Sequence, residues 1–584
     1  MISLATISLI SGGLFVVLYL AYRALLPKPL AGIPYNKDAA NKLFGDVPEV
    51  MGYVKSTKQI YAWFTELAVK HKSPVVQAFI KPGSLPWVVV TDPYEIQDIL
   101  LRRTKDFDRA SFFHDVLSGI IQYQASQYVS DHPIYKHNKN LINHLMAPSF
   151  INQISAPEVY KSVINLIQVW EVKCDKAEGR PFAAHHDTTY QALDFIFAAL
   201  FEVTGDDSIT VQRLKTISSY TPSFTAPSSN SMEPVPFPDG PVPQPQASFL
   251  TLTNSIMHTQ LSPFPTLTST IHTKFPSMRH AISTKESFFR NKIDQAVSHI
   301  DKDPSSPPRN AIHSVLLRER ETALKESRTP DYHQRGIYDE FVGLVMAGHD
   351  TSATSVAWGV KYLADAPAVQ TRLRSALKNA FPDAARQNRA PNFEELMSSH
   401  IPYLDAVTEE VLRLASSIDF VVRVALRDTT VLGRHIPKGT DVFLAGNGPG
   451  FHKASMPLGL SEQDDEIRSP GARKKNGKML SGLWEDEGIH EFKPERWLKK
   501  DGEGKEVFDP LAGPTLAFGL GPRGCFGKRL ALVSLRMQFA LIIWHFELLG
   551  GMPEKMCHFR AVQKFAREPE VCFVRLKRVD MTGV

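Results

Sequence analysis

The sequence has few cysteines and little net charge, and both features exclude classes of protein. Four cysteines among 584 residues form no C-x-x-C pair and no zinc-ligand spacing. A disulfide framework and a structural zinc site are therefore not expected, and a reducing compartment is the simpler expectation. The formal net charge is +5 and no block rich in lysine and arginine occurs, so nucleic-acid binding is not expected.

Charged residues are also missing from the beginning of the chain. Residues 2–22 carry no charged side chain, and a helix needs about 20 apolar residues to cross a bilayer. The first basic residues, Arg23 and Lys28, follow this stretch, which places the rest of the chain on the cytosolic side. A cleaved signal peptide is the alternative, but its basic n-region is missing. We expect a single-pass membrane anchor over 1–26 and a proline-rich hinge over 27–44.

Two later stretches differ in composition from the rest of the chain. The stretch near 221–250 is rich in serine, threonine and proline, and the stretch near 455–485 is highly charged. Such compositions do not build a packed core, so both are predicted to be exposed insertions. For the first insertion, a disordered loop without chemistry and a gate for substrate remain alternatives.

One glycine-rich stretch surrounds a single cysteine. Residues 518–527 read F-G-L-G-P-R-G-C-F-G, and a long apolar helical run begins at Lys528. Cys525 therefore lies at or just before a helix N-terminus, where the helix dipole and unpaired N–H groups favour a thiolate. A thiolate held in this way is an electron-donating ligand for haem iron. The alternative is a buried cysteine in a glycine-rich turn before a core helix.

This stretch resembles the haem-binding signature of the cytochrome P450 family. The fixed places of the signature are filled by Phe518, Gly519, Gly521, Arg523, Cys525 and Gly527. The resemblance implies a cytochrome P450 fold over residues 45–584, mainly α with a smaller β region. It also implies that Cys525 ligates the iron, and that Phe518 and Arg523 contact the haem, with Arg523 on a propionate.

A second motif lies in a long apolar segment, 338–364, which contains no proline and is predicted to be a buried helix. Its middle reads A-G-H-D-T-S, which resembles the family motif [A/G]-G-x-[D/E]-T. The resemblance implies that Asp350 and Thr351 deliver protons for dioxygen activation and that Gly348 lets the haem approach the backbone. The alternative is a threonine that bonds back within its helix without function. His349 is interpreted as a nearby or solvent-facing residue rather than an iron ligand.

A charge network is predicted from two distant motifs. Y-L-D-A-V-T-E-E-V-L-R-L places Glu410 and Arg413 three residues apart on one helix face, and F-K-P-E-R-W supplies Arg496. These motifs resemble the E-x-x-R helix and the following segment of the family. By that resemblance the three residues form a network that positions the cysteine loop and does no chemistry itself.

Two further basic residues are candidates for binding haem propionates. The family carries W-x-x-x-R on one helix, and here Tyr135 and Lys139 occupy those positions. A lysine lacks the planar fork of arginine, and a solvated basic face is the alternative for Lys139. Arg423 matches a second propionate ligand, although the proline that usually precedes its strand is absent.

The resemblance as a whole implies a haem-thiolate monooxygenase. Such an enzyme holds haem b and inserts one atom of O2 into a lipophilic organic substrate. Its electrons come from NADPH through NADPH-cytochrome P450 reductase, with cytochrome b5 as an optional second donor. With the predicted anchor, the implied location is the endoplasmic reticulum membrane, with contact to lipid.

Two other functions remain open. An isomerase or dehydratase of the same fold rearranges a peroxide without a reductase, but such enzymes tend to lose the acid–threonine pair that this chain keeps at Asp350 and Thr351. A non-enzymatic membrane haem protein is the second alternative. Consumption of NADPH and O2 that depends on substrate separates an enzyme from a carrier.

Overall fold

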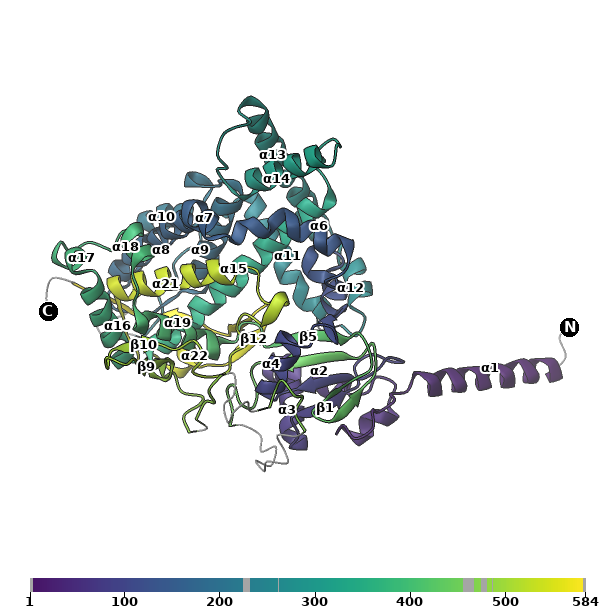
Figure 1. Cartoon of the computed structure of the whole chain (residues 1–584). Coiled ribbons are helices and arrows are strands. Elements are labelled where there is room, and N and C mark those ends of the chain that lie inside the picture. Colours follow the sequence, from purple (N-terminus) through teal and green to yellow (C-terminus); the bar gives the residue numbers. More distant parts are fainter. Residues whose placement is uncertain are drawn as a thin grey trace. The chain divides into compact units, whose positions relative to one another are not determined.

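The computed structural model describes residues 4–223, 232–260, 262–454, 467–473, 481–485 and 487–580. The chain forms two compact units, each assembled from segments distant in sequence (Figure 1). Unit 1 comprises Met1–Ala110, Asp419–Ile489 and Gly519–Pro522. Unit 2 comprises Ser111–Ile418, His490–Phe518 and Arg523–Val584.

Unit 1 is built around a five-stranded sheet with the strand order β1-β2-β8-β5-β3. Strand β2 pairs with β8 in parallel, and the other neighbours are antiparallel. The strands of unit 1 are β1 (Val75–Ala78), β2 (Trp87–Val90), β3 (Phe107–Arg109), β5 (Phe420–Ala425), β6 (Thr429–Val431), β7 (Arg434–Ile436) and β8 (Asp441–Ala445). The helices of unit 1 are α1 (Leu4–Leu25), α2 (Val47–Thr57), α3 (Tyr61–His71) and α4 (Pro93–Leu101). Valine-rich strands β1 and β2 are buried along their length, as β-branched residues on a covered sheet should be.

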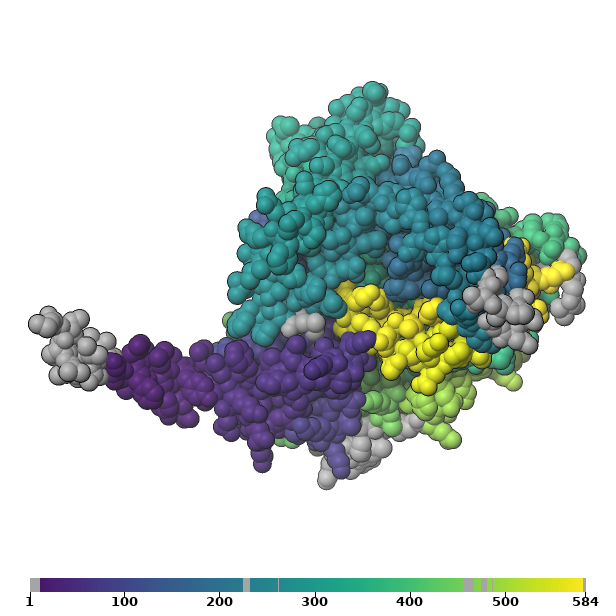
Figure 2. Space-filling model, turned by 180° about the vertical axis from the view of Figure 1, so that it is seen from behind, coloured from purple at the N-terminus to yellow at the C-terminus, as the bar shows by residue number. Residues whose placement is uncertain are grey.

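The N-terminal segment is helical, as expected from its composition. Helix α1 extends from the rest of unit 1, and the side chains of residues 14–20 are exposed (Figures 1 and 2). Among the residues that the structure describes, no helix is both long and apolar enough to span a bilayer. The first ten residues of the predicted anchor fall outside the residues whose side chains are described. The hinge is held on strand β1, because the Leu30 N–H donates to Oε1 of Gln77 over 2.8 Å.

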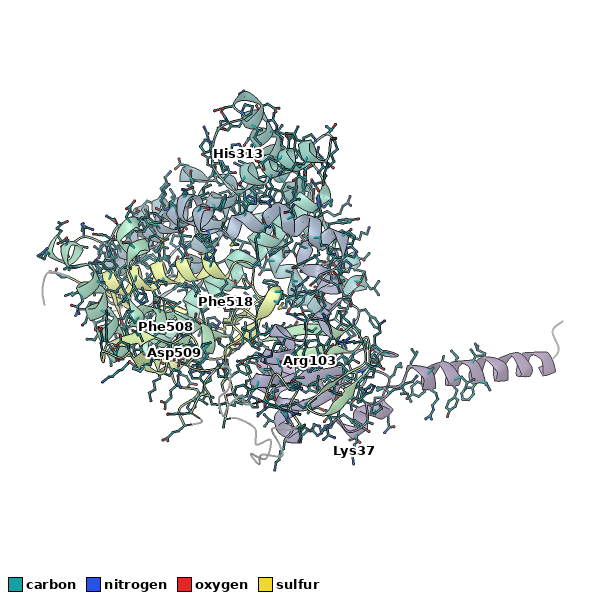
Figure 3. All side chains as sticks on the ribbon, in the orientation of Figure 1. Lys37, Arg103, His313, Phe508, Asp509 and Phe518 are labelled. Carbon is teal, nitrogen blue, oxygen red and sulfur yellow. The ribbon has the colours of Figure 1, made fainter. Side chains whose placement is uncertain are left out.

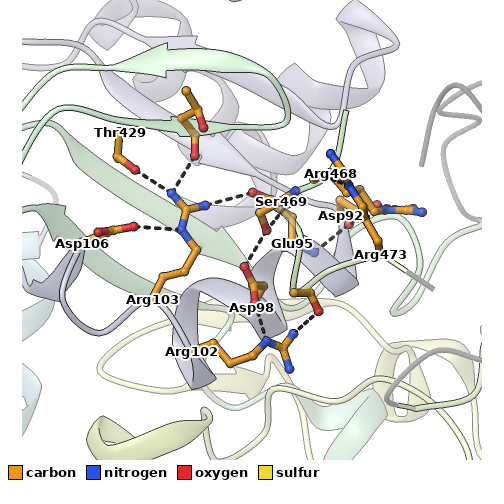
Figure 4. A network of polar contacts seen from close by, with 12 residues as sticks. Asp92, Glu95, Asp98, Arg102, Arg103, Asp106, Thr429, Arg468, Ser469 and Arg473 are labelled. Atoms are coloured by element: carbon orange, nitrogen blue, oxygen red, sulfur yellow. Dashed lines mark hydrogen bonds and ion pairs between the residues drawn. The ribbon is translucent and has the colours of Figure 1, made fainter. Parts of the chain in front are cut away.

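The described part of the charged insertion is bonded to helix α4 (Figure 4). Arg468 pairs with Asp92, the N-cap of α4, over 2.8 Å. The hydroxyl of Ser469 donates to Glu95 over 3.0 Å and also to Asp98. Both of these carboxylates are buried. Residues 467–473 are therefore docked on unit 1, whereas 455–466 and 474–480 lie outside the described residues.

Unit 2 is mainly helical. Its long helix α15 packs against α9, α19 and α21. The helices of unit 2 are α5 (Phe112–Leu117), α6 (Pro133–Ile142), α7 (Pro148–Phe150), α8 (Ala156–Ala177), α9 (His185–Phe201), α10 (Ile209–Ser219), α11 (Gln244–Gln260), α12 (Pro265–His272), α13 (Pro276–Lys302), α14 (Ala311–Lys325), α15 (Arg335–Ala364), α16 (Pro367–Ala380), α17 (Pro382–Arg386), α18 (Phe393–Ser398), α19 (Pro402–Ala415), α21 (Lys528–His545) and α22 (Glu554–Cys557). The buried helix predicted over 338–364 is thus present, with one further turn at its N-terminal end.

The strands of unit 2 form four small antiparallel pairs: β4 with β14, β9 with β10, β11 with β15, and β12 with β13. Their bounds are β4 (Phe182–Ala183), β9 (Leu498–Lys500), β10 (Glu506–Phe508), β11 (Phe546–Leu548), β12 (Ala561–Gln563), β13 (Arg567–Pro569), β14 (Phe573–Val574) and β15 (Leu576–Arg578). The β12–β13 hairpin packs on α15 and brings its turn to the middle of that helix.

The proline-rich insertion has more structure than its composition predicted. Its last residues belong to helix α11, which begins at Gln244. Before that helix, Val235 donates its N–H to the carbonyl of Pro181 over 2.9 Å. The ring of Phe237 meets the ring of Phe182 edge-on at 5.8 Å. This part of the insertion therefore lies on β4, and residues 224–231 are outside the described residues.

Candidate functional site

The loop that carries Cys525 is tightly folded. The N–H of Cys525 donates to the carbonyl of Phe518 over 2.7 Å, and Phe518 is labelled in Figure 3. Gly521 has φ +69°, and a Cβ added there would lie 2.1 Å from the carbonyl oxygen of Leu100. This position requires glycine, because the left-handed angle and the close backbone both exclude a side chain. Helix α21 begins directly after Gly527, so Cys525 precedes a long helix as predicted.

The surroundings of the sulfur act on its ionisation in both directions. The Cys525 residue is exposed, yet enough protein atoms surround the sulfur that burial raises the pKa of the thiol. Hydrogen bonds from the backbone N–H groups of Gly527 and Lys528, and the positive charges of Lys528 and Lys139, oppose this rise. These donors and charges would stabilise a thiolate once a cation such as iron is bound to it.

Helix α6 meets the cysteine loop through two side chains one turn apart. The ammonium of Lys139 lies 3.8 Å from the centroid of the Phe526 ring. The guanidinium of Arg523 lies 4.2 Å from the centroid of the Tyr135 ring. Arg523 also donates to the carbonyl of Tyr128 over 2.7 Å. The structure therefore places the predicted pair Lys139 and Arg523 together beside Cys525.

The predicted charge network is assembled around one buried carboxylate, Glu410. Its oxygens accept hydrogen bonds from Arg413 over 2.8 Å and from Arg496 over 2.9 Å. They also accept the indole N–H of Trp497 over 2.9 Å and the backbone N–H of Lys493 over 3.0 Å. Sequence reasoning missed these last two donors, although the tryptophan stands next to Arg496 in the motif.

The tryptophan of this network is itself held in place. Its ring stacks on Phe508 with the centroids 6.2 Å apart, and its carbonyl accepts the N–H of Asp509 over 2.7 Å. Figure 3 labels Phe508 and Asp509, which follow each other at the end of β10. The residues at the end of β10 thus hold Trp497, one of the donors to Glu410, in place.

Asp350 is bonded to the turn of the β12–β13 hairpin. Its Oδ2 accepts the N–H of Ala566 over 3.0 Å. The residue keeps some solvent access, but burial of the carboxyl, together with the nearby charge of Glu568, raises the pKa of Asp350 to about 7. A carboxyl with this pKa can both hold and release a proton near neutral pH.

Thr351 bonds back within its helix, since its hydroxyl donates to the carbonyl of Ala347 over 2.8 Å. This is the local bond that the alternative interpretation predicted, and it leaves the oxygen of the hydroxyl able to accept a further bond. Ala347 is exposed and Thr351 partly exposed, although most of α15 is buried. One face of the helix at this point is therefore not covered by protein.

The two other residues of the motif face protein. Nδ1–H of His349 donates to the carbonyl of Val345 over 2.8 Å. Burial lowers the pKa of His349 to about 4, so the ring is neutral and not solvent-facing. A Cβ on Gly348 would lie 2.6 Å from Cδ1 of Ile196, so the glycine allows α9 to pack closely. Its predicted contact with haem stays a prediction.

Arg423 lies in unit 1 and is not part of the cluster that unit 2 assembles around Cys525. It is buried on strand β5, and its guanidinium donates to the carbonyl of Val422 over 3.0 Å. Its role as a propionate ligand stays a prediction.

Sequence reasoning also missed two acidic residues at the start of α15. Asp339 accepts the N–H groups of Gln122 and Tyr123 over 2.8 Å each. The buried Glu340 accepts the N–H of Ala125 and the amide of Asn138. Burial raises the pKa of Glu340 to about 7. Two consecutive carboxylates in an apolar helix were the signal that could have revealed this bonding.

The residues of unit 2 fit a haem group. They offer one sulfur ligand with backbone donors around it, two cations for propionates at Lys139 and Arg523, and an uncovered face at Ala347 and Thr351 on a helix that packs against α21. A single thiolate as the protein ligand is typical of haem proteins that activate dioxygen.

Comparisons with known proteins agree with this geometry. The family model described as "Cytochrome P450" matches residues 43–448 and 489–573. The chain is 34% identical to "Cytochrome P450 monooxygenase TRI13" of Fusarium sporotrichioides, over 97% of this chain and 98% of that protein. It is 32% identical to "Cytochrome P450 monooxygenase GME11363" of Pestalotiopsis microspora, over 98% of each. The solved cytochrome P450DA heme domain shares the fold, with a TM-score of 0.63 at 16% identity, over 95% of this chain and 98% of that chain.

Proposed function

The chain belongs to the cytochrome P450 family, and from this premise we propose that it is a haem-thiolate monooxygenase acting on a lipophilic organic substrate. Family membership implies the haem-thiolate cofactor, and the relatives bear the name of monooxygenases. The finer statements are our proposal: haem b as the cofactor, and electrons from NADPH through NADPH-cytochrome P450 reductase, with cytochrome b5 as an optional donor.

The observation that carries the proposal is the environment of Cys525. The thiol receives hydrogen bonds from the N–H groups of Gly527 and Lys528 and faces the charges of Lys528 and Lys139. These interactions favour the negatively charged sulfur that an iron ligand must be. Lys139 and Arg523 would hold the propionates. The Glu410 network would fix residues 493–497, which precede the cysteine loop in the chain, and would help to keep the loop in place.

The bound haem would supply dioxygen activation and oxygen transfer, and this chain would supply protons and exclude water. Asp350 would hold a proton on its carboxyl and release it at Oδ, since its pKa of about 7 lies near neutral pH. The hydroxyl of Thr351 would pass that proton on from its place on the uncovered face of α15. The N–H of Ala566 fixes the carboxyl of Asp350 in one orientation.

The retained acid favours a monooxygenase over an isomerase or dehydratase of the same fold. A peroxide-rearranging enzyme needs no proton donor with this pKa, whereas splitting O2 to give water consumes protons. The two functions are separated by adding NADPH and reductase to the purified protein with its substrate. Turnover that proceeds equally well without both would contradict the monooxygenase proposal.

We also propose that the protein is held at the endoplasmic reticulum membrane with its catalytic part on the cytosolic side. Two observations support contact with lipid, one in each unit. Residues 14–20 of α1 are exposed and apolar. In unit 2 the exposed side chains of Phe264, Leu267, Ile271 and Phe275 follow helical spacing over α12 and the turn after it. Expressing the chain without residues 1–26 should move it from the microsomal to the soluble fraction, or weaken its membrane attachment so that detergent is no longer needed to release it. If the shortened chain still needs detergent for its release, as the full chain does, the anchor is refuted.

The ligand is tested by the spectrum of the reduced carbon monoxide complex. Thiolate-ligated haem in this family absorbs near ~450 nm in that complex, and we expect Cys525→Ala to lose the band. Cys174→Ala is the matched control, because Cys174 is also a free cysteine but lies on α8. A band that survives in Cys525→Ala would overturn the assignment of the ligand.

A further inference from the structure

The contact between α6 and the cysteine loop is reciprocal. Helix α6 offers the cation of Lys139 to the ring of Phe526, at 3.8 Å from the ring centroid. The loop offers the cation of Arg523 to the ring of Tyr135, at 4.2 Å from the centroid. Tyr135 and Lys139 are one turn apart on the helix, and Arg523 and Phe526 stand on the two sides of Cys525 in the chain. Each element thus supplies one cation and one ring.

The geometry of both contacts is close enough to be energetically useful. A cation within about 6 Å of a ring centroid is attracted to the ring face, most strongly where water is excluded. Lys139 is partly buried, and this burial lowers its pKa, while the opposing charges of Glu340 and Cys525 favour the ammonium. Among the bonds that the structure describes for Lys139, none joins it to a carboxylate. The ring of Phe526 is therefore the partner in contact with this partly desolvated lysine.

The ammonium of Lys139 is held next to the cysteine loop. It lies 3.8 Å from the ring centroid of Phe526, which directly follows Cys525 in the chain. A positive charge that stabilises a negative sulfur also stabilises the added electron when the bound iron is reduced, because both increase the negative charge at the site. In a partly buried place this effect is only weakly screened by salt.

We propose that the two cation–ring contacts form a clasp that fixes Cys525 against α6 and holds the Lys139 charge beside the sulfur, and so raises the reduction potential of the iron. Phe526 is a positioning residue in this clasp, since it acts through Lys139. The inference rests on the proposed function, because it concerns the iron that Cys525 would bind. It goes beyond propionate binding, which requires Lys139 and Arg523 but gives the two rings no part.

The test is a set of potentiometric titrations of the purified, haem-loaded full-length chain. The variants are Lys139→Met, Lys139→Arg, Phe526→Leu and the double variant Lys139→Met with Phe526→Leu. The matched control is Lys136→Met, which removes the same charge from the same helix at an exposed position that pairs with Asp131. Haem content and the carbon monoxide spectrum are recorded for every variant.

We expect Lys139→Met to shift the ferric–ferrous equilibrium about tenfold toward the ferric form, which is about 59 mV for a one-electron couple. Phe526→Leu should shift it in the same direction, because the lysine loses the ring that holds it near the sulfur. The double variant should shift it no further than Lys139→Met alone, and Lys139→Arg should retain most of the wild-type potential. Lys136→Met should change the equilibrium less than twofold.

Two results would overturn the clasp: additive effects of Lys139→Met and Phe526→Leu, or an effect of Lys136→Met as large as that of Lys139→Met. If Lys139→Met fails to bind haem, Phe526→Leu and Lys139→Arg decide, and an unchanged potential in Phe526→Leu refutes the proposal. A wild-type protein without the thiolate spectrum would instead refute the proposed function, so the two failures are distinguishable.

Discussion

Replacing Glu410 by glutamine should destabilise unit 2 strongly, although the two side chains have nearly the same shape. Glu410 is fully buried and receives the guanidinium groups of Arg413 and Arg496, the indole of Trp497 and one backbone N–H. In the glutamine variant, the side-chain amide N–H₂ group faces these donors and cannot accept their hydrogen bonds. The negative charge of the carboxylate is also lost. Two buried or nearly buried arginines then lack their counter-charge.

The size of the effect follows from this arrangement. Breaking a buried ion pair by removing one partner costs about 3–5 kcal/mol, which is a large part of the stability of a typical domain. We expect a thermal midpoint of the holoenzyme lower by about 3–6 °C, together with a smaller fraction of haem-loaded protein. The lost haem follows because the network lies in the same unit as Cys525 and holds residues 493–497, which precede the cysteine loop in the chain.

Glu409→Gln is the control for this prediction. Glu409 is the neighbouring residue of the same helix, and burial raises its pKa to about 7, so roughly half of its charge is already absent at pH 7. Differential scanning calorimetry or circular dichroism at several heating rates gives the midpoints, and haem content is measured optically. If Glu410→Gln melts within about 1 °C of Glu409→Gln, the network does not stabilise the fold.

Two further predictions concern pH and backbone conformation. The folded pKa of Asp350 is about 7 against 3.8 for the free group, so the unfolded chain releases this proton first and stability falls as pH rises from about 4 to 7. Asp350→Asn should therefore match the wild type in free energy of unfolding at pH 4 and exceed it at pH 8 by up to about 4 kcal/mol. Thermal midpoints report this difference, and equal midpoints at pH 8 would contradict the raised pKa. Gly521→Ala should lower the yield of haem-loaded protein severely, because the new Cβ would lie 2.1 Å from the carbonyl oxygen of Leu100 at a residue with positive φ. Gly502→Ala is the control and should be neutral, because no atom lies within 4 Å of its new Cβ. Similar yields from both variants would show that the loop can relax.

The features that could be read from the sequence are those contained in one continuous segment. The apolar, proline-free pattern of 338–364 predicted α15, and the spacing of Glu410 and Arg413 placed them on one helix face. The glycines around Cys525 predicted a tight loop before a helix. In each case the residues that interact are neighbours along the chain, so local geometry alone fixes their relation.

The partners from distant segments were not predictable in the same way. Trp497 as a donor to Glu410, and the N–H of Ala566 on Asp350, depend on which turn packs against which helix. Compositional reasoning also treated both insertions as exposed loops, whereas Ser469 is bonded to carboxylates on α4 and Val235 to the edge of β4. Proline and charge content describe a segment without its neighbours, and these neighbours supply the bonds.

The sequence by itself determined the family, the cysteine proposed as the iron ligand and the long helix that carries Asp350 and Thr351, because those features are local patterns of residue type and spacing. Only the tertiary structure decided what surrounds them. It placed Phe526 over Lys139, gave Asp350 a pKa of about 7 and gathered Arg413, Arg496 and Trp497 on one buried carboxylate. Desolvation and charge pairing depend on which atoms come together in space, and chain order does not encode that directly.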